Sequence, residues 1–303
     1  MTIRIHLGAH KTATTELQRA LRSVRDALGS DGLGYLGPRA LRSEVSPLFH
    51  AIHKGEPDAW ESCRRRFAGW LSRHEDHLIS EENILGTTFR GAMFGKDNRI
   101  YPAASEALSQ LIVLLGGGPV ELFLSVRDPA QFVTSAYGQQ LKTGTGIDIE
   151  SYTGGVSVAD LSWTDLVQRL LSVPGVARLI CWRYEDYAAL RPVILERMLG
   201  AERAAIVPAA SWRNAGISDA AYRAFAEMVM EDLESPVEDL LQRACALHPK
   251  TEGVPAMRPL RPRVYGRARR NYAQDMARLS ALEGVELLAP DAGGESGSRR
   301  GSA

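Results

Sequence analysis

The sequence is poor in cysteine and has no excess of either charge. Its 303 residues include only Cys63, Cys181 and Cys245, which are far apart and form no CxxC pair. A disulfide framework and a zinc site are therefore not supported, and we expect three small buried side chains. Lys and Arg total 36 and Asp and Glu total 36, so the net charge is zero. A general nucleic-acid-binding protein would be basic, which argues against nucleic acid as a partner.

Long apolar runs are also missing. No stretch approaches the roughly 20 apolar residues of a membrane helix, and no charged-then-apolar leader precedes the first strand-like segment. We therefore expect no membrane span and a cytoplasmic location. With 45% hydrophobic residues, the chain can bury a large core. We expect one domain over residues 1–290 and a disordered Gly/Ser-rich tail over 291–303; the sequence leaves the oligomeric state open.

Short strand-like segments alternate with helical patterns along the first two thirds of the chain. Helical spacing follows the first segment through Leu28, and Asp128 and Pro129 suit the start of another helix. This alternation predicts an α/β fold, with a parallel central sheet, helices on both faces and a helical C-terminal part after about residue 190. Ligands bind such sheets at the carboxyl ends of the strands. The predicted strands are 2–7, 76–80, 120–126 and 177–182.

A glycine-containing turn, "GAHKTATTELQ" (8–18), follows the first predicted strand. Backbone N–H groups at a helix start, together with the charge of Lys11, favour an anion there. The NTPase phosphate loop places a glycine directly before its lysine. Here His10 stands at that position and Gly8 lies three residues before Lys11. The loop therefore predicts a phosphate-like ligand but does not match a triphosphate loop.

A second strand-to-helix junction lies in "SVRDPAQFVTSAY" (125–137). Arg127 ends the predicted strand, where a guanidinium can hold a phosphate through two parallel hydrogen bonds. Ser135, about two turns into the following helix, can add a hydroxyl.

Together the two segments resemble the motifs of sulfotransferases that use 3′-phosphoadenosine 5′-phosphosulfate (PAPS). The family's 5′-phosphosulfate loop commonly reads G-x-x-K-[ST]-G-T-[ST]-x-L, and Ala13 replaces its usual second glycine. We expect alanine to be tolerated if it keeps helical or near-helical dihedrals. The 3′-phosphate motif reads R-[ND]-P-x(5)-S-x-[YF], and residues 181–187 add a weaker likeness. The residues in register are Gly8, Lys11, Thr12, Thr14, Thr15 and Leu17 in the first motif, and Arg127, Asp128, Pro129, Ser135 and Tyr137 in the second.

The resemblance covers about residues 1–200 and implies a P-loop NTPase-like three-layer sandwich of the bacterial sulfotransferase type. It implies transfer of a sulfuryl group from PAPS to a hydroxyl, or an amine, of a carbohydrate or other small acceptor, with PAP as the second product. No metal is expected. Lys11 would be catalytic, and the residues implied in cofactor binding are Gly8, His10, Lys11, Thr12, Ala13, Thr14, Thr15, Arg127 and Ser135.

A general base is wanted near the sulfuryl group, and Glu81, after the second predicted strand, is the candidate. Glu82 and His10 stay open as alternatives, and acidic residues after Ser80 would also favour a helix start without any catalytic role. The basic run 261–270 indicates a charged helix face, with a 3′-phosphate or an anionic acceptor as the alternative ligand.

Three further points remain open in the sequence. His50 and His53 share one helix face, which could be surface or acceptor pocket. Residues 142–155 read as a mobile loop over the site or an ordinary surface loop. A P-loop kinase using ATP, or a non-catalytic nucleotide-binding protein of the same fold, is the alternative function.

Overall fold

The computed structural model describes residues 2–44, 46–211 and 216–290. Six strands form one parallel sheet in the order β2-β5-β1-β6-β7-β8, which confirms the predicted α/β class. All four predicted strands belong to it, while β2 and β8 were not predicted. The strands are β1 (Thr2–His6), β2 (Leu33–Leu36), β5 (Asp76–Ser80), β6 (Val120–Val126), β7 (Val176–Arg183) and β8 (Val285–Leu288), beside a small antiparallel pair, β3 (Arg42–Ser43) and β4 (Ser46–Pro47).

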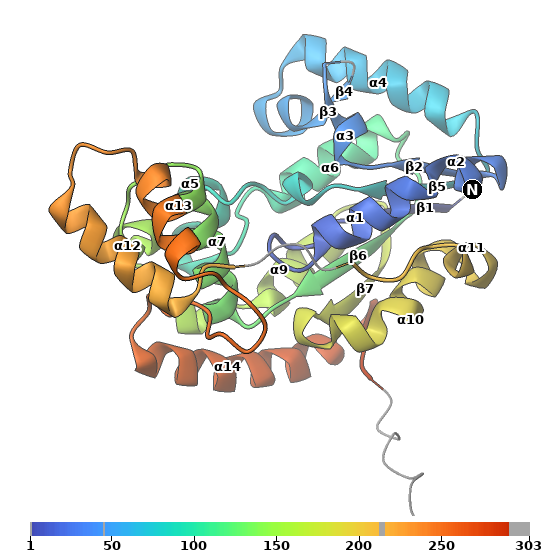
Figure 1. Cartoon of the computed structure of the whole chain (residues 1–303). Helices are drawn as coiled ribbons and strands as arrows, with labels where there is room; N and C mark the ends of the chain where they lie inside the picture. The colour runs from blue at the N-terminus through green and yellow to red at the C-terminus, as the bar shows by residue number, and fades with distance from the viewer. Residues whose placement is uncertain (1, 45, 212–215, 291–303) are drawn as a thin grey trace, which may run out of the picture.

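Helices cover both faces of the sheet (Figure 1). One face packs against α1, α2, α10 and α11, and the opposite face packs against α6, α7, α9 and α14. The longer helices are α1 (Thr14–Ser23), α2 (Arg25–Ser30), α4 (Pro57–Leu71), α6 (Ala104–Leu114), α7 (Pro129–Lys142), α9 (Trp163–Leu171), α10 (Tyr187–Leu199), α12 (Asp219–Glu231), α13 (Val237–Leu247) and α14 (Pro262–Ser280). The short ones are α3 (Pro38–Leu41), η1 (His50–Lys54), η2 (Glu82–Ile84), α5 (Arg90–Met93), η3 (Lys96–Asn98), α8 (Ile149–Thr153), η4 (Val158–Asp160), η5 (Tyr184–Asp186) and α11 (Ala201–Ala205).

Strand β1 lies at the centre of the sheet, between β5 and β6. Its alternation works as predicted: Ile3 and Ile5 are fully buried on one face, and His6 lies on the other, with its ring stacked on Trp182 at 5.9 Å. The chain leaves β1 toward β2 and β5 on one side and later returns to build β6, β7 and β8 on the other. The strand order therefore reverses between β1 and β6, and ligand sites form at such a crevice.

Some local expectations change. The helix predicted through Leu28 is two helices, because Val24 leaves helical geometry at φ −111°, ψ 9°. Asp128 caps α7 as expected, accepting from the Gln131 N–H at 3.1 Å. Residues 142–155 are not an open loop, since they hold α8, and the Tyr137 hydroxyl donates to the Ile147 carbonyl at 3.0 Å. The predicted tail, 291–303, lies outside the described residues.

The burial expected for the three cysteines is found at two of them. Cys63 and Cys181 are buried, as expected, and Cys245 is half-buried. Within residues 2–44, 46–211 and 216–290, no helix combines the length and apolarity needed to cross a bilayer.

Candidate functional site

The loop that follows β1 is shaped by one glycine and two threonines. Gly8 has φ 42°, and a Cβ there would lie 2.7 Å from the Thr14 hydroxyl oxygen. Both facts exclude a larger residue. The buried Thr12 and Thr14 hydroxyls donate to the Ala9 carbonyl at 2.6 and 3.3 Å. These two hydroxyls therefore hold the loop in shape, whereas Thr15 is exposed at the start of α1.

A run of backbone N–H groups in this loop lacks protein acceptors. The His10 N–H donates to the Tyr101 hydroxyl at 3.1 Å, and the Glu16 N–H donates to the Ala13 carbonyl at 2.9 Å. Between these two, the N–H groups of residues 11–15 donate to no acceptor among the described residues. The last of them belong to the first turn of α1, which carries partial positive charge. Such consecutive free amides form a donor set suited to phosphate or sulfate.

Two non-glycine residues in the loop adopt left-handed dihedrals. Lys11 has φ 65° and Ala13 has φ 67°, ψ 9°. The condition under which alanine was expected to be tolerated here, helical or near-helical dihedrals, is therefore not met, and a glycine would adopt these dihedrals without strain. A left-handed alanine costs roughly 1–2 kcal/mol. Strained backbone of this kind is concentrated at functional sites.

Arg127 connects this loop to the second predicted motif. Its Nη1 donates to the Lys11 carbonyl oxygen at 2.8 Å, and its guanidinium carbon lies 4.4 Å from the centre of the Tyr184 ring. The Trp163 indole N–H donates to the Arg127 carbonyl at 2.8 Å. The guanidinium is thus oriented by a hydrogen bond and a ring, which leaves further N–H donors for a ligand.

A cavity of about 630 Å³ opens beside Arg127. Tyr184 lines it, and three further arginines, Arg183, Arg258 and Arg269, contribute positive charge. Residues 181–187, which weakly resemble a sulfotransferase segment, therefore include residues that line this cavity.

The basic run 261–270 divides between two environments. Arg269 lines the cavity beside Arg127, whereas Arg267 pairs with Asp160 at 2.6 Å. Part of the run is therefore a salt-bridged helix face, and part faces the cavity.

The Lys11 ammonium lies against α7. Its Nζ donates to Gln139 Oε1 at 3.2 Å, and burial, with Lys142 and Arg127 nearby, lowers its pKa. Ser135 lies one turn before Gln139 and so shares its helix face. It is half-buried and does not line the cavity beside Arg127; Gln131, a turn earlier, does.

Glu81 is buried in a tight ion pair. Its carboxylate accepts from Arg42 Nε at 2.9 Å, from Arg42 Nη2 at 2.6 Å and from the Asn83 N–H at 2.9 Å. Burial raises the pKa of Glu81, and the hydrogen bonds from Arg42 offset only part of that rise. With 2% of its surface exposed, Glu81 has little access to a ligand.

Glu82 is the neighbouring carboxylate that reaches open space. It accepts from Arg42 Nη2 at 2.8 Å and from Gln18 Nε2 at 2.8 Å, and it lines a cavity of about 1750 Å³. Burial acts to raise the pKa of Glu82, but Arg42, His10 and Gln18 outweigh it and bring the pKa below the usual value. Of the two candidate bases from this segment, Glu82 is placed to meet a ligand.

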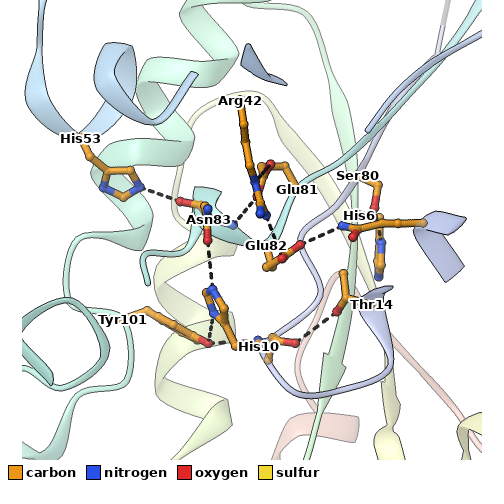
Figure 2. A network of polar contacts seen from close by, with 12 residues as sticks. His6, His10, Thr14, Arg42, His53, Ser80, Glu81, Glu82, Asn83 and Tyr101 are labelled. Carbon is orange, nitrogen blue, oxygen red and sulfur yellow. Dashed lines mark hydrogen bonds and ion pairs between the residues drawn. The ribbon is translucent and has the colours of Figure 1, made fainter. Parts of the chain in front are cut away.

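His10 is held by neighbours at both ring nitrogens (Figure 2). Nδ1 lies 2.7 Å from the Tyr101 hydroxyl, and Nε2 lies 3.1 Å from Asn83 Oδ1. This arrangement fits a neutral ring that accepts at Nδ1 and donates at Nε2, and burial lowers its pKa. His10 therefore positions the loop, and neither nitrogen is left to take a proton from a ligand.

The two histidines of η1 diverge. His53 Nε2 lies 2.9 Å from the Asn83 carbonyl, which adds it to the network around His10, whereas His50 pairs with Glu56 at the surface. His53 thus helps to hold Asn83, the partner of His10, whereas His50 makes no hydrogen bond with this network among the described residues.

The sequence did not indicate Arg42, Asn83 or Tyr101 as site residues. Arg42 comes from a region without motifs, and only the fold brings it to Glu81 and Glu82. Tyr101, fully buried with φ 50°, contacts His10 across 91 residues of sequence, so no local pattern could have found it.

Among residues 2–44, 46–211 and 216–290, no three His, Cys, Asp or Glu side chains gather to form a metal site.

No family model and no curated protein sequence matches the chain. Among solved structures, a sulfotransferase from Alicyclobacillus acidocaldarius aligns at 14% identity, over 82% of this chain and 95% of that one, with a TM-score of 0.43.

Proposed function

We propose that the chain is a sulfotransferase that transfers a sulfuryl group from PAPS to a hydroxyl-bearing acceptor and releases PAP. The observation that carries the proposal is the set of free N–H groups at residues 11–15, joined with the Lys11 ammonium and connected through the Lys11 carbonyl to Arg127. The hydrogen bond from Arg127 to the Lys11 carbonyl holds the loop next to the cavity that Arg127 lines. The two donor groups are therefore close enough to bind two anionic groups of one nucleotide.

The residues present fit such a nucleotide. The amides of residues 11–15 would hold the 5′-phosphosulfate, and Arg127 with the arginines of its cavity would hold the 3′-phosphate end. PAPS supplies an activated sulfuryl group, and transfer leaves negative charge on the phosphate oxygen that bridged to sulfur. Lys11 lies at this end of the site and would stabilise that charge.

A carboxylate must take the acceptor proton as the acceptor oxygen bonds to sulfur. Glu82 is proposed for this role in place of Glu81, because it lines open space while Glu81 is saturated by Arg42 and the Asn83 N–H. Arg42 bridges the two carboxylates and so positions Glu82.

The test is release of PAP from labelled PAPS in the presence of a panel of hydroxyl compounds. We expect acceptor-dependent PAP release by the wild-type protein and none above background with Lys11→Ala. Phosphate transfer from ATP, with no turnover of PAPS, would contradict the proposal and favour a kinase. Binding of PAP with no turnover for any acceptor would favour a non-catalytic nucleotide-binding protein.

A further inference from the structure

A groove of about 1750 Å³ lies on the side of the sheet covered by α1 and α2. Its walls are the outer side of α1 and α2, the segment from β2 to Arg42, and the facing side of α4. In Figure 1, α4 stands over α1 and α2 as a separate upper layer. Pockets for drug-sized ligands usually measure about 300–1000 Å³, so this groove suits a longer molecule. We call it the arginine groove.

Eight arginines line the arginine groove. Three come from α1 and α2, namely Arg19, Arg22 and Arg25. Three more, Arg65, Arg66 and Arg73, come from α4 and the turn after it.

Arg39 and Arg42 complete the set between these walls, and only two acidic residues, Asp26 and Glu82, accompany them. The chain as a whole has zero net charge, so the fold concentrates positive charge here. Grouping like charges is unfavourable for folding on its own, which favours an anionic ligand.

Most of these guanidinium groups are not neutralised by the protein. Every arginine of the groove is exposed. Arg22 and Arg66, on opposite walls, have no carboxylate within ion-pair distance among the described residues, and the same is true of Arg19, Arg39 and Arg73. The contrast is Arg42, which is bound by Glu81 and Glu82. Open, unpaired guanidinium groups are the donors that recognise carboxylate, sulfate or phosphate.

The arginine groove is continuous with the proposed transfer site. Thr15, Gln18 and Glu82 are among the residues that line it, and the Thr15 N–H is one of the free amides of the loop. From Thr15 to Arg22 the wall runs along α1 for about 10 Å, and Arg25 follows at the start of α2. A chain-like molecule in the groove would therefore present one group to Glu82 while its anionic groups contact successive arginines.

Nucleic acid is the less suitable occupant. Proteins that hold single strands stack bases on exposed aromatic rings. The only Phe, Tyr or Trp side chains lining the groove are Tyr35 and Trp70, and each is only 6% exposed.

We propose that the acceptor is an acidic oligosaccharide, which offers hydroxyl groups together with repeated carboxylate or sulfate groups, and that it binds in the arginine groove. This rests on the proposed sulfotransferase function, and it adds the substrate class and the residues that recognise it.

The test uses oligogalacturonate of four to six sugar units and its fully methyl-esterified, uncharged counterpart. Binding is measured by titration calorimetry with no nucleotide present, and PAP is titrated separately. The variant Arg22→Gln/Arg66→Gln removes one unpaired cation from each wall. Arg99→Gln/Arg243→Gln is the matched control, because both residues are exposed, do not line the groove and change the net charge equally.

We expect the acidic saccharide to bind and its ester not to bind. The groove variant should weaken that binding about tenfold, binding should fall with added salt, and the control variant and PAP binding should be unchanged. If PAP binds but the acid and the ester bind equally or not at all, the groove proposal fails and the sulfotransferase proposal stands.

Other outcomes also decide between the two proposals. Saccharide binding without PAP binding would overturn the acceptor role and the proposed function, leaving an anion-binding surface. Loss of PAP binding in the groove variant would assign the groove to the nucleotide and overturn the proposal. Tighter binding of a single-stranded oligonucleotide than of the acidic saccharide would also overturn it.

Discussion

Arg127 Nη1 donates to the carbonyl oxygen of Lys11 at 2.8 Å, across 116 residues of sequence. In a trans peptide the C=O and the following N–H point in opposite directions, so this bond turns the Thr12 N–H away from Arg127. The same arginine therefore fixes the orientation of the loop amides and lines the neighbouring cavity. Changes at Arg127 should affect both ends of a nucleotide bound there.

Replacing Arg127 by alanine should weaken PAP binding by about 10- to 100-fold, the effect of losing charged hydrogen bonds. Adenosine 5′-phosphate should lose less, because it lacks the 3′-phosphate and depends on Arg127 only through the loop. Calorimetric titration of both nucleotides checks this. Equal losses for the two would remove Arg127 from the 3′-phosphate site.

Lys11→Ala should lower kcat for sulfuryl transfer by at least about 100-fold, as expected when one group that stabilises developing charge is removed. The melting temperature should hardly change, since among the described residues the lysine side chain makes one hydrogen bond, to Gln139. Lys54→Ala, an exposed lysine of η1, is the control. Turnover near the wild-type level in Lys11→Ala would exclude this role.

Ala13→Gly should be neutral or should stabilise the fold by up to about 1 kcal/mol, because relief of the left-handed strain exceeds the entropy that glycine loses on folding. Ala27→Gly, at an exposed position inside α2, should instead destabilise by about 0.5–1 kcal/mol. Urea unfolding of both variants measures the difference. A cost at Ala13 as large as the cost at Ala27 would show that the loop is not strained there.

Glu82→Gln should reduce kcat by about 10²- to 10⁴-fold with a small effect on stability. Because Arg42, His10 and Gln18 hold the pKa of Glu82 below its usual value, the group stays ionised above about pH 5, and the rate should show no acid limb from it between pH 5 and 8. A pH–rate profile of kcat/KM measures this.

Glu81→Gln is the companion variant. It should chiefly destabilise the protein, by about 1–2 kcal/mol, because it breaks the pair with a half-exposed Arg42. If Glu81→Gln abolished turnover in a stable protein while Glu82→Gln remained active, the base would be Glu81.

His6 should make stability depend on pH. Burial lowers its pKa to about 4 from the usual 6.5, so below pH 6.5 the unfolded chain binds a proton that the folded chain refuses. The free energy of unfolding should therefore fall as the pH drops from about 6.5 to about 4, by about 3 kcal/mol from this residue. In His6→Asn the fall should be shallower by that amount; identical curves for His6→Asn and the wild type would contradict the assignment.

How far the sequence predicts this molecule depends on the range of the interactions involved. The strand β1, the cap at Asp128 and the placement of Lys11 and Arg127 at strand-to-helix junctions follow from local patterns, whereas the adjacency of β1 and β6 appears only in the fold. Strand β2 has four residues, all buried, too few to show an alternation. Ala13 looked tolerable because a sequence does not display dihedrals.

The environment of the acidic pair was equally hidden. Glu81 and Glu82 are adjacent in sequence, yet the fold buries one under Arg42 and leaves the other at a cavity. That difference comes from Arg42, 39 residues away from Glu81 in the chain, in a region without any motif. The eight arginines of the groove are likewise spread over separate elements, so their concentration appears only in the fold.

The central claim is that the loop after β1 and the cavity beside Arg127 bind one nucleotide with phosphate groups at both its 5′ and 3′ positions. Titration calorimetry of the wild-type protein with PAP, with ATP and Mg²⁺ as the parallel experiment, tests it most directly. We predict tight binding of PAP at one site and much weaker binding of ATP. Preference for ATP over PAP would contradict the claim and make the loop a triphosphate site.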